Sequence, residues 1–370
     1  MHLLDNFSTV EQALIAKAAQ RKLPINGSIE LLPLCNMNCD MCYVRLSREE
    51  MEKQGRLRTV QEWLEIVEQM KQAGTLFLLL TGGEPLLYPQ FKELYLKLLE
   101  MGMILTINTN GTLIDEEWAA FFGQHKPRRI NITLYGAGED TYSKLCHYPG
   151  GFEKTINGIR LLQKNNVDVK IGSSLTKTNR KDVKRILEIG DALGAPVRVD
   201  TYMLPATRER KQPFCMQSRA LPKDAAEIRM GVLKRELGEE RYCQYKEQTL
   251  EMVKEISDGK KTREGSGCFA GKCSFTINWQ GEMRPCVIMS SPSVSVFEQG
   301  FEKAWKYITE EMEKMILNAK CSSCSLRPLC RTCAACAWHE TGGYKGIPKY
   351  MCDYAEESLK LLKDEGAFSF

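Results

Sequence analysis

The chain has 370 residues, of which 43% are hydrophobic and 26% are charged. This length allows one barrel-sized domain with a smaller module, and the composition excludes a disordered or fibrous protein. The net charge of +4, from 51 basic and 47 acidic residues, predicts no nucleic-acid partner. The chain opens with no signal peptide, and no apolar run approaches the roughly eighteen residues of a membrane span. We therefore expect a cytoplasmic protein with no membrane partner.

Between residues 28 and 204, β-type segments alternate with amphipathic helical segments. Strands are expected at 28–34, 76–83, 104–111, 129–136, 167–175 and 197–204. Helices, with apolar residues three and four apart, are expected at 59–74, 90–102, 115–123, 152–165 and 180–194. This alternation predicts an α/β fold, a partial (β/α)6 TIM barrel of parallel strands, with its chemistry in the loops at the carboxyl ends of the strands.

The segments outside the barrel differ in character. We expect a short N-terminal helical segment at 1–27, the barrel at 28–204, a helical bridging segment at 205–265 and a cysteine-rich module at 266–370. The last module is punctuated by glycine and poor in long strands. Its order is therefore expected to depend on bound metal.

The cysteines are the unusual feature of this composition, because a reduced cytosolic chain has little structural use for fifteen of them. Three lie between residues 35 and 42, nine lie between 268 and 352, and Cys146, Cys215 and Cys243 stand apart in the sequence. Such clustering predicts metal or redox chemistry.

Cys35, Cys39 and Cys42 directly follow the first predicted strand, in the segment CNMNCDMC. Structural zinc sites and closed cubane iron–sulfur clusters usually take four protein ligands, whereas three thiolates leave one iron of a cubane open for a substrate. Taken alone, the spacing is as compatible with a zinc site or reduced core thiols as with an open cluster.

Two further motifs make the sequence resemble the radical S-adenosylmethionine (SAM) family, whose signature is CxxxCxxC after the first strand of a partial barrel. Gly82, Gly83, Glu84 and Pro85 end the second predicted strand as TGGEP, similar to the family segment whose backbone receives the amino group of SAM, and glycine permits that close approach. The motif NTNG, which contains Asn110, ends the third strand. The resemblance implies that Cys35, Cys39 and Cys42 hold a 4Fe–4S cluster that reduces SAM to methionine and a 5′-deoxyadenosyl radical.

The same resemblance implies further cofactor-binding residues at the strand ends. Thr133 after the fourth strand, and Ser173 or Ser174 after the fifth, would face the ribose, and Arg198 would bind a carboxylate. A polar residue at a strand end can instead be a solvated cap. The family usually has an aromatic residue before its third cysteine, where this chain has Met41, so we place Tyr43 among the residues expected to contact the cofactor.

The C-terminal cysteines resemble the SPASM extension of radical SAM enzymes, which binds two auxiliary 4Fe–4S clusters. This would make three clusters in all. The analogy assigns one auxiliary cluster to Cys268, Cys273, Cys286 and Cys333, and the other to Cys321, Cys324, Cys330 and Cys352. The family leaves three residues before the cysteine that follows Cys330, whereas this chain leaves two. Either Cys333 or Cys336 could therefore be the ligand, and we favour Cys333. Zinc is the alternative occupant of these paired cysteines.

SPASM-bearing enzymes of this kind resemble maturases of ribosomally made peptides and anaerobic sulfatase-maturing enzymes. The resemblance implies a peptide or small-protein substrate, modified by a crosslink, thioether or epimerisation, and an electron donor such as flavodoxin or ferredoxin. The alternatives are a small-molecule radical SAM oxidoreductase and a zinc-binding scaffold protein.

The candidates for catalytic residues follow the sixth predicted strand or lie on it. Cys215 could donate a hydrogen atom, or be a buried thiol. Asp200 or Tyr202 could act as an acid or a radical-handling group, and structural pairing is the alternative. The four histidines form no recognisable catalytic frame, so the sequence does not support triad hydrolysis.

Overall fold

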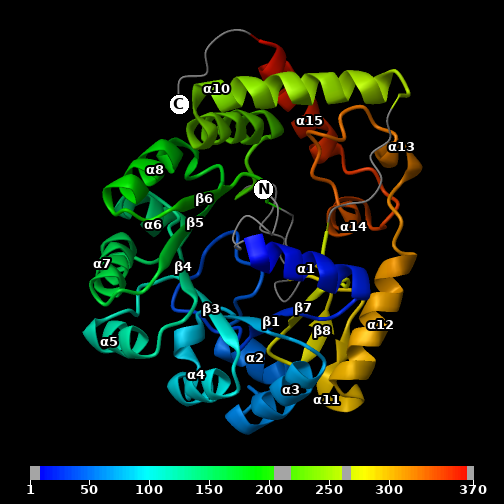
Figure 1. The fold of residues 1–370 in the computed structure, drawn as a ribbon. Coiled ribbons are helices and arrows are strands. Elements are labelled where there is room, and N and C mark those ends of the chain that lie inside the picture. Colours follow the sequence, from blue (N-terminus) through cyan, green and yellow to red (C-terminus); the bar gives the residue numbers. More distant parts are fainter. Residues whose placement is uncertain (1–8, 204–217, 261–267, 365–370) are drawn as a thin grey trace.

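The computed structural model describes residues 9–203, 218–260 and 268–364 (Figure 1). Cys215, a predicted hydrogen-atom donor, lies outside the described residues. Within the described ranges, no helix combines the length and the apolar character needed to cross a bilayer.

An open nine-stranded sheet organises the molecule, in the order β6-β5-β4-β3-β2-β1-β7-β8-β9. Its first six strands pair in parallel, as predicted. They are β1 (Asn26–Glu30), β2 (Phe77–Thr81), β3 (Ile104–Thr109), β4 (Arg129–Thr133), β5 (Val169–Ser174) and β6 (Val197–Asp200). Each ends several residues earlier than the sequence predicts, or one residue earlier in the case of β5.

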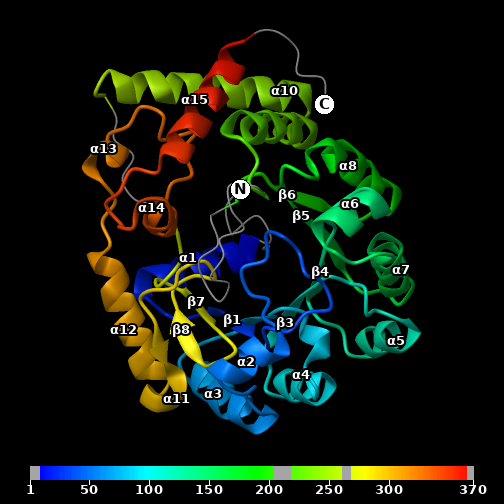
Figure 2. The same ribbon diagram turned by 180° about the vertical axis from the view of Figure 1, so that it is seen from behind.

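The predicted helices are present and cover the outer face of this curved sheet (Figure 2). They are α3 (Val60–Gln72), α4 (Phe91–Glu100), α5 (Glu116–Gln124), α7 (Gly151–Lys164) and α8 (Val183–Ala192), the last preceded by a 3-10 turn at Arg180–Asp182. Thr59 and Glu62 form a capping box that fixes the start of α3. The sequence does not predict the shorter helices α2 (Arg48–Gln54) and α6 (Glu139–Leu145), because each is too short to display a clear apolar period.

The two faces of the barrel sheet differ in polarity. Buried aliphatic side chains such as Ile107, Ile132 and Ile171 pack against the outer helices in one core cluster. The alternate positions of β3, β4 and β5 are only partly buried, and several are polar: Thr106, Asn108, Asn131, Thr133, Lys170 and Ser174. Parallel strands are usually buried and apolar on both faces. The inner face of this barrel is therefore more polar than is usual for parallel strands.

The cysteine-rich segment begins by extending the barrel sheet. Strand β7 (Ser274–Ile277) pairs in parallel with β1, and β8 (Glu282–Arg284) and β9 (Val294–Ser295) continue it in antiparallel fashion. After α11 (Val296–Gln299), helix α12 (Phe301–Lys314) packs on the sheet, with the rings of Phe301 and Trp305 5.1 and 5.8 Å from that of Phe275. A Cβ atom at Gly27 would lie 2.5 Å from the Phe275 ring, so glycine at this position of β1 admits the ring.

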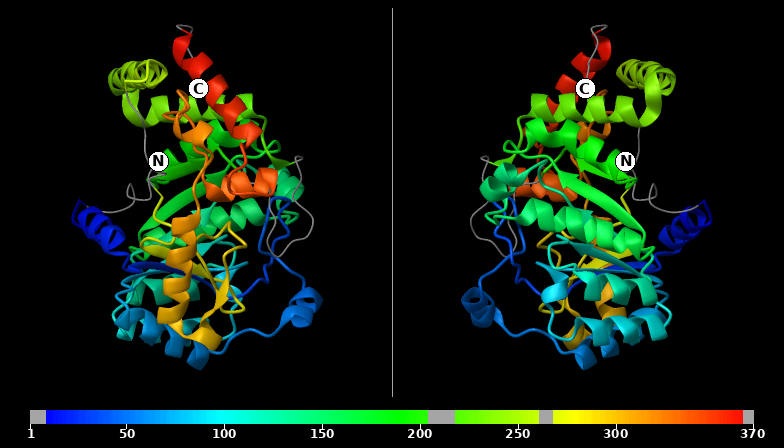
Figure 3. Two further views of the ribbon diagram at one scale, coloured as in Figure 1. Left: turned by 90° about the vertical axis from the view of Figure 1, so that its right-hand side faces the viewer. Right: turned by 90° about the vertical axis from the view of Figure 1, so that its left-hand side faces the viewer.

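The remaining helices lie around the ends of the barrel. Helix α1 (Thr9–Arg21) leads into β1. Helix α10 (Pro222–Ser257), which is kinked at Gly238, packs beside α15 (Lys349–Lys363) (Figures 1 and 2). Two shorter helices, α13 (Ala319–Ser322) and α14 (Ala334–Thr341), precede α15 in the chain. Figure 3 shows α1 and α2 on opposite sides of the barrel. Since α1 precedes β1 and α2 follows the loop after β1, these helices mark the amino and carboxyl edges of the strands.

Replacing Phe275 by Ala should lower the free energy of unfolding by about 3–5 kcal/mol, because it empties a buried aromatic site between β1 and α12. Tyr307→Ala on the same helix is the control: that side chain is 41% exposed, so its removal should change the free energy by less than about 0.5 kcal/mol. Urea unfolding of both variants measures this difference. Equal effects would show that β7 is not anchored through this ring.

Candidate active site

Cys35, Cys39 and Cys42 lie in the loop after β1, at the carboxyl edge of the sheet. Two of their sulfur atoms accept backbone hydrogen bonds: Met37 N–H donates to Cys35 Sγ over 3.4 Å, and Arg45 N–H donates to Cys42 Sγ over 3.2 Å. Such donors stabilise thiolates and tune iron–sulfur sites. The set of three soft donors on one short loop therefore fits an open iron–sulfur site.

The last residue of α6 and the residue that follows it hold this loop. Asn38 N–H donates to the Cys146 carbonyl and Asp40 N–H to the Leu145 carbonyl, each over 3.0 Å. The Cys39 thiol is hydrogen-bonded to the buried thiol of Cys146. In the described ranges, no three Cys, His, Asp or Glu side chains are already arranged as the ligands of one metal ion. Cys146 stands apart in the sequence but contacts this site. Sequence reasoning did not predict the contact, because more than a hundred residues separate Cys146 from Cys39.

The two glycines of TGGEP are required by the chain itself. A Cβ atom at Gly83 would lie 2.2 Å from the Leu34 carbonyl oxygen, and one at Gly82 would lie 2.5 Å from that of Leu32. Gly83 N–H donates to the Leu32 carbonyl over 2.7 Å, and Glu84 N–H donates to that of Leu34 over 2.9 Å. The sequence predicts that these glycines allow a ligand to come close. In the structure, the atoms that come close to them belong to the backbone that leads into Cys35. Binding of the SAM amino group by this motif stays a prediction.

Glu84 is fully buried between β2 and β3, just before the 3-10 turn at Pro85–Leu87. Its carboxylate accepts hydrogen bonds from Thr109 Oγ1 (2.7 Å), Asn110 N–H (2.8 Å) and Leu86 N–H (3.2 Å). Burial raises the pKa of Glu84 to about 7, against the opposing effect of these donors. Burial and then the Glu84 carboxylate also raise the pKa of the Cys35 thiol. Both carboxylate oxygens of Glu84 therefore bind the protein, close to the cysteine loop.

The other predicted cofactor residues divide between the two faces of the sheet. Thr133 and Arg198 are both level with Gly172 on the inner face. Ser174 shares this face, whereas Ser173 is buried on the outer one, so the alternation favours Ser174 as the residue that faces a ligand.

Two other predicted cofactor residues, Arg198 and Tyr43, have partners within the protein: Arg198 forms an ion pair and Tyr43 packs against the core. The Arg198 guanidinium pairs with the Asp200 carboxylate at 2.9 Å, which is the structural alternative to an acid role for Asp200. Tyr43 packs partly buried against the main core, directly after Cys42.

Tyr202 belongs to a polar cluster that joins the barrel to α14. Its hydroxyl lies 2.6 Å from Cys336 Sγ and donates to Glu340 over 3.3 Å, and Glu340 pairs with Arg219 at 2.7 Å. Arg219 is 5% exposed and stacks over the Tyr350 ring at 3.4 Å. Sequence reasoning missed Arg219 and Glu340, because the members of this cluster are far apart in the chain.

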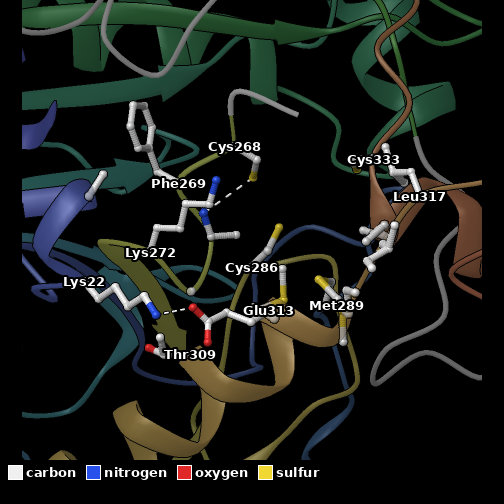
Figure 4. Close-up of a pocket in the computed structure, with 18 of the residues that line it drawn as sticks. Lys22, Cys268, Phe269, Lys272, Cys286, Met289, Thr309, Glu313, Leu317 and Cys333 are labelled. Atoms are coloured by element: carbon white, nitrogen blue, oxygen red, sulfur yellow. Dashed lines mark hydrogen bonds and ion pairs between the residues drawn. The ribbon is translucent and has the colours of Figure 1, made fainter. Parts of the chain in front are cut away.

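A cavity of about 720 Å³ brings together three of the C-terminal cysteines, Cys268, Cys286 and Cys333 (Figure 4). It lies beside the end of α1, at the amino edge of β1 and β7, and so opposite the Cys35 loop. Cys273 is buried next to it: burial and then the Cys268 thiol raise the pKa of Cys273 to about 12. Cys336 does not line the cavity, since its thiol is turned to Tyr202. This arrangement supports Cys333 over Cys336 in the first group.

The second group of cysteines lies where α13 and the following loop meet α15. Burial, followed by the thiols of Cys330, Cys321 and Cys324, raises the pKa of Cys352. Cys352 is therefore close enough to the other three thiols to be influenced by their charges, although among the described residues no set of three or more ligands is already arranged around a metal site. Soft sulfur donors in sets of four fit iron–sulfur clusters or zinc.

Residues 29–189 match the model of the Radical SAM superfamily. This stretch is a radical SAM domain. The family implies SAM and a 4Fe–4S cluster as cofactors, and the three thiols of the Cys35 loop are the matching donors at the expected edge of the barrel.

Two curated relatives align with most of this chain. It is 25% identical over 333 residues to the AdoMet-dependent heme synthase of Methanosarcina barkeri, an alignment that covers 85% of this chain and 92% of the synthase. It is 21% identical over 348 residues to the subtilosin biosynthesis protein AlbA of Bacillus subtilis, covering 90% of this chain and 72% of AlbA.

Two solved structures share the fold of this chain. SuiB of Streptococcus suis, bound to its precursor peptide SuiA, has a TM-score of 0.66 and 16% identity, over 93% of this chain and 80% of SuiB. The enzyme anSMEcpe, with bound AdoMet and the Cp18Cys peptide, has a TM-score of 0.65 and 18% identity, over 90% of this chain and 95% of anSMEcpe. The partial barrel and its C-terminal extension thus have the same fold as these two proteins.

Replacing Glu84 by Gln should destabilise the radical SAM domain at pH 8 by about 1–3 kcal/mol, because an amide nitrogen would then face one of the three donors. The pH dependence should also change. The pKa of Glu84 is raised in the folded state from 4.5 to about 7, so its contribution to stability is present at low pH and is lost as the pH rises to about 7.

Anaerobic thermal unfolding of the holoenzyme between pH 6 and 8 measures both effects. The wild type should lose about 1 kcal/mol between pH 6 and 7 through this group, and the variant should lack that loss. An identical pH profile in the two proteins would contradict the raised pKa.

Proposed function

We propose that the protein is a radical SAM enzyme that modifies a peptide or small protein. The observation that carries this proposal is the fold: more than nine-tenths of the chain follows SuiB bound to its precursor peptide. The structure of anSMEcpe with a peptide, and the relative AlbA, named for the biosynthesis of a bacteriocin, add support. The polar inner face of the barrel provides hydrogen-bonding groups that suit a substrate rich in amides.

In this proposal Cys35, Cys39 and Cys42 hold the 4Fe–4S cluster, and SAM binds beside it along the carboxyl edge. When bound, these groups supply a 5′-deoxyadenosyl radical that removes a substrate hydrogen atom. The chain itself positions the reactants: Glu84 and the glycines before it fix the cysteine loop, and Thr133 and Ser174 lie on the inner face of the barrel. Orientation of this kind is the protein's contribution to rate.

The two C-terminal cysteine groups are proposed to hold auxiliary 4Fe–4S clusters. Cys268, Cys273, Cys286 and Cys333 form the first set, and Cys321, Cys324, Cys330 and Cys352 the second. Strand β1 has five residues, so the first set is separated from the Cys35 loop by roughly 16 Å or more along the strands. We infer that these clusters carry electrons, delivered at the start by a donor such as flavodoxin or ferredoxin.

A small-molecule substrate is the second candidate, favoured by one observation. The heme synthase of Methanosarcina barkeri has a higher sequence identity to this chain than AlbA has, and the alignment spans 92% of its length. In that case the auxiliary clusters would serve only as electron relays. A zinc-binding scaffold is the non-enzymatic alternative for the same cysteines.

The proposed function is tested with anaerobically reconstituted, reduced enzyme incubated with SAM and candidate peptides. We expect 5′-deoxyadenosine and a modified peptide by mass spectrometry: a loss of about two mass units for a crosslink, or an unchanged mass with inverted stereochemistry for an epimer. The control is the triple variant Cys35→Ala, Cys39→Ala, Cys42→Ala, which should form no 5′-deoxyadenosine and keep the iron of the C-terminal clusters.

Three outcomes would contradict parts of this proposal. Formation of 5′-deoxyadenosine by the triple variant would refute the assignment of the Cys35 loop. Turnover of a tetrapyrrole precursor with no peptide modified would replace the peptide by a small molecule. Stoichiometric zinc without sulfide in anaerobically purified protein would favour the scaffold.

The choice between Cys333 and Cys336 gives a matched pair of variants. Cys333→Ala should lower the iron content by up to one cluster, because it removes a thiol of the Cys268 cavity. Cys336→Ala should keep the iron, since Cys336 contacts Tyr202 and Glu340 instead. Iron and sulfide analysis measures both, and the reverse result would make Cys336 the ligand.

A further inference from the structure

Asn110, at the end of β3, has every polar group held by a neighbour. Its backbone N–H donates to Glu84 Oε2 over 2.8 Å, and its carbonyl accepts from Thr155 Oγ1 over 3.1 Å. Its side-chain oxygen accepts from both the backbone N–H (3.0 Å) and the hydroxyl (2.7 Å) of Thr112. The residue is 9% exposed, so these contacts are made in a largely dry site.

These contacts decide which way the side-chain amide points. A backbone N–H can only donate, so the Asn110 atom that faces Thr112 N–H is the oxygen and the opposite atom is the nitrogen. That nitrogen donates to Asn36 Oδ1 over 2.8 Å and lies 3.8 Å from Cys35 Sγ. One N–H of the amide is therefore available to each of these two acceptors.

Asn36 and Thr112 close the arrangement into a ring. Asn110 Nδ2 donates to Asn36 Oδ1, Asn36 Nδ2 donates to Thr112 Oγ1 over 2.8 Å, and Thr112 Oγ1 donates to Asn110 Oδ1. Each donor meets an acceptor in one consistent direction. The ring binds the residue next to Cys35 to the end of β3, some 75 residues along the chain.

We propose that Asn110 is a positioning residue for the iron–sulfur site: its amide holds the Cys35 loop through Asn36 and donates a hydrogen bond to the Cys35 sulfur. A donor to a ligating sulfur stabilises the more negatively charged, reduced state, and so raises the reduction potential. The family resemblance places Asn110 among residues that contact SAM. The structure gives its side chain a different partner, the cysteine loop, and this inference rests on the proposed cluster at that loop.

The test is an EPR-monitored redox titration of the holoenzyme without SAM, with the titration of the Cys35→Ala, Cys39→Ala, Cys42→Ala variant subtracted to remove the auxiliary clusters. Asn110→Asp keeps the shape and the acceptor for Thr112 but loses both N–H groups and places an oxygen near the sulfur. We expect its cluster potential to become more negative, with a roughly tenfold lower ratio of reduced to oxidised cluster at a fixed potential, about 59 mV for one electron.

Asn131→Asp is the matched control. On the inner face of the barrel, Asn131 Nδ2 donates to Asn108 Oδ1 over 2.8 Å. The Asn131 amide therefore binds another side-chain amide, whereas the Asn110 amide also reaches a cysteine sulfur. The variant should leave the cluster potential unchanged. Asn110→Ser, which removes the amide without adding charge, should shift the potential in the same direction but less, and it keeps the test possible if Asn110→Asp fails to assemble the cluster.

The outcomes separate this inference from the proposed function. A potential equal to that of the wild type in iron-replete Asn110→Asp or Asn110→Ser would overturn the role of Asn110 while leaving the cluster assignment intact. An equal shift in Asn131→Asp would also overturn it, because the effect would not depend on the sulfur contact. Absence of a SAM-responsive cluster in the wild type would instead defeat the proposed function.

Discussion

The buried carboxylate of Glu84 joins three strand ends at the edge of the barrel where the cysteines lie. Its own N–H binds the backbone that leads from β1 into Cys35, and its oxygens bind Thr109 and Asn110 at the end of β3. A buried carboxyl group with its hydrogen bonds made is rigid, and costly to disturb. The backbone before Cys35 and the end of β3 therefore meet at this one residue, and the glycines directly before it permit the close backbone contact.

The polarity of the barrel interior follows from how the sheet ends. A closed parallel barrel fills its interior with aliphatic side chains, but this sheet stays open between β6 and β9. The inner face then carries asparagine, threonine and lysine side chains. Polar side chains on neighbouring strands can hydrogen-bond one another there, as Asn131 does with Asn108. The C-terminal segment extends the sheet through β7 and packs α12 on it. The same segment brings Cys268, Cys286 and Cys333 together beside the barrel.

Local patterns in the sequence predict the barrel strands, the outer helices and the Cys35 loop, because each is encoded within a short window by period-two or helical spacing, or by cysteines a few residues apart. The grouping of the C-terminal cysteines rests on the family resemblance instead, because the members of each group are spread over tens of residues. The contacts that position the site are not local. The Cys35 loop is held by Cys146 and Asn110, and Tyr202 by Cys336 and Glu340, across 75 to 138 residues. Only the folded chain reveals such pairs. The family resemblance also assigns the glycines of TGGEP to a ligand, whereas the nearest atoms belong to the backbone before Cys35.

Different cysteine groups lie at the two ends of β1. At the carboxyl end lies the Cys35 loop, and at the amino end lies the cavity with Cys268, Cys286 and Cys333, beside α1. Helix α14 begins directly after Cys333 and carries Cys336 and Glu340 to Tyr202, which follows β6 at the carboxyl edge. The cysteine group with Cys333 is thus connected to the carboxyl edge of the barrel through one short helix as well as along β1 and β7. A buried ion pair such as Arg219–Glu340 is a weak source of stability, but it holds α14 beside Tyr202 at that edge.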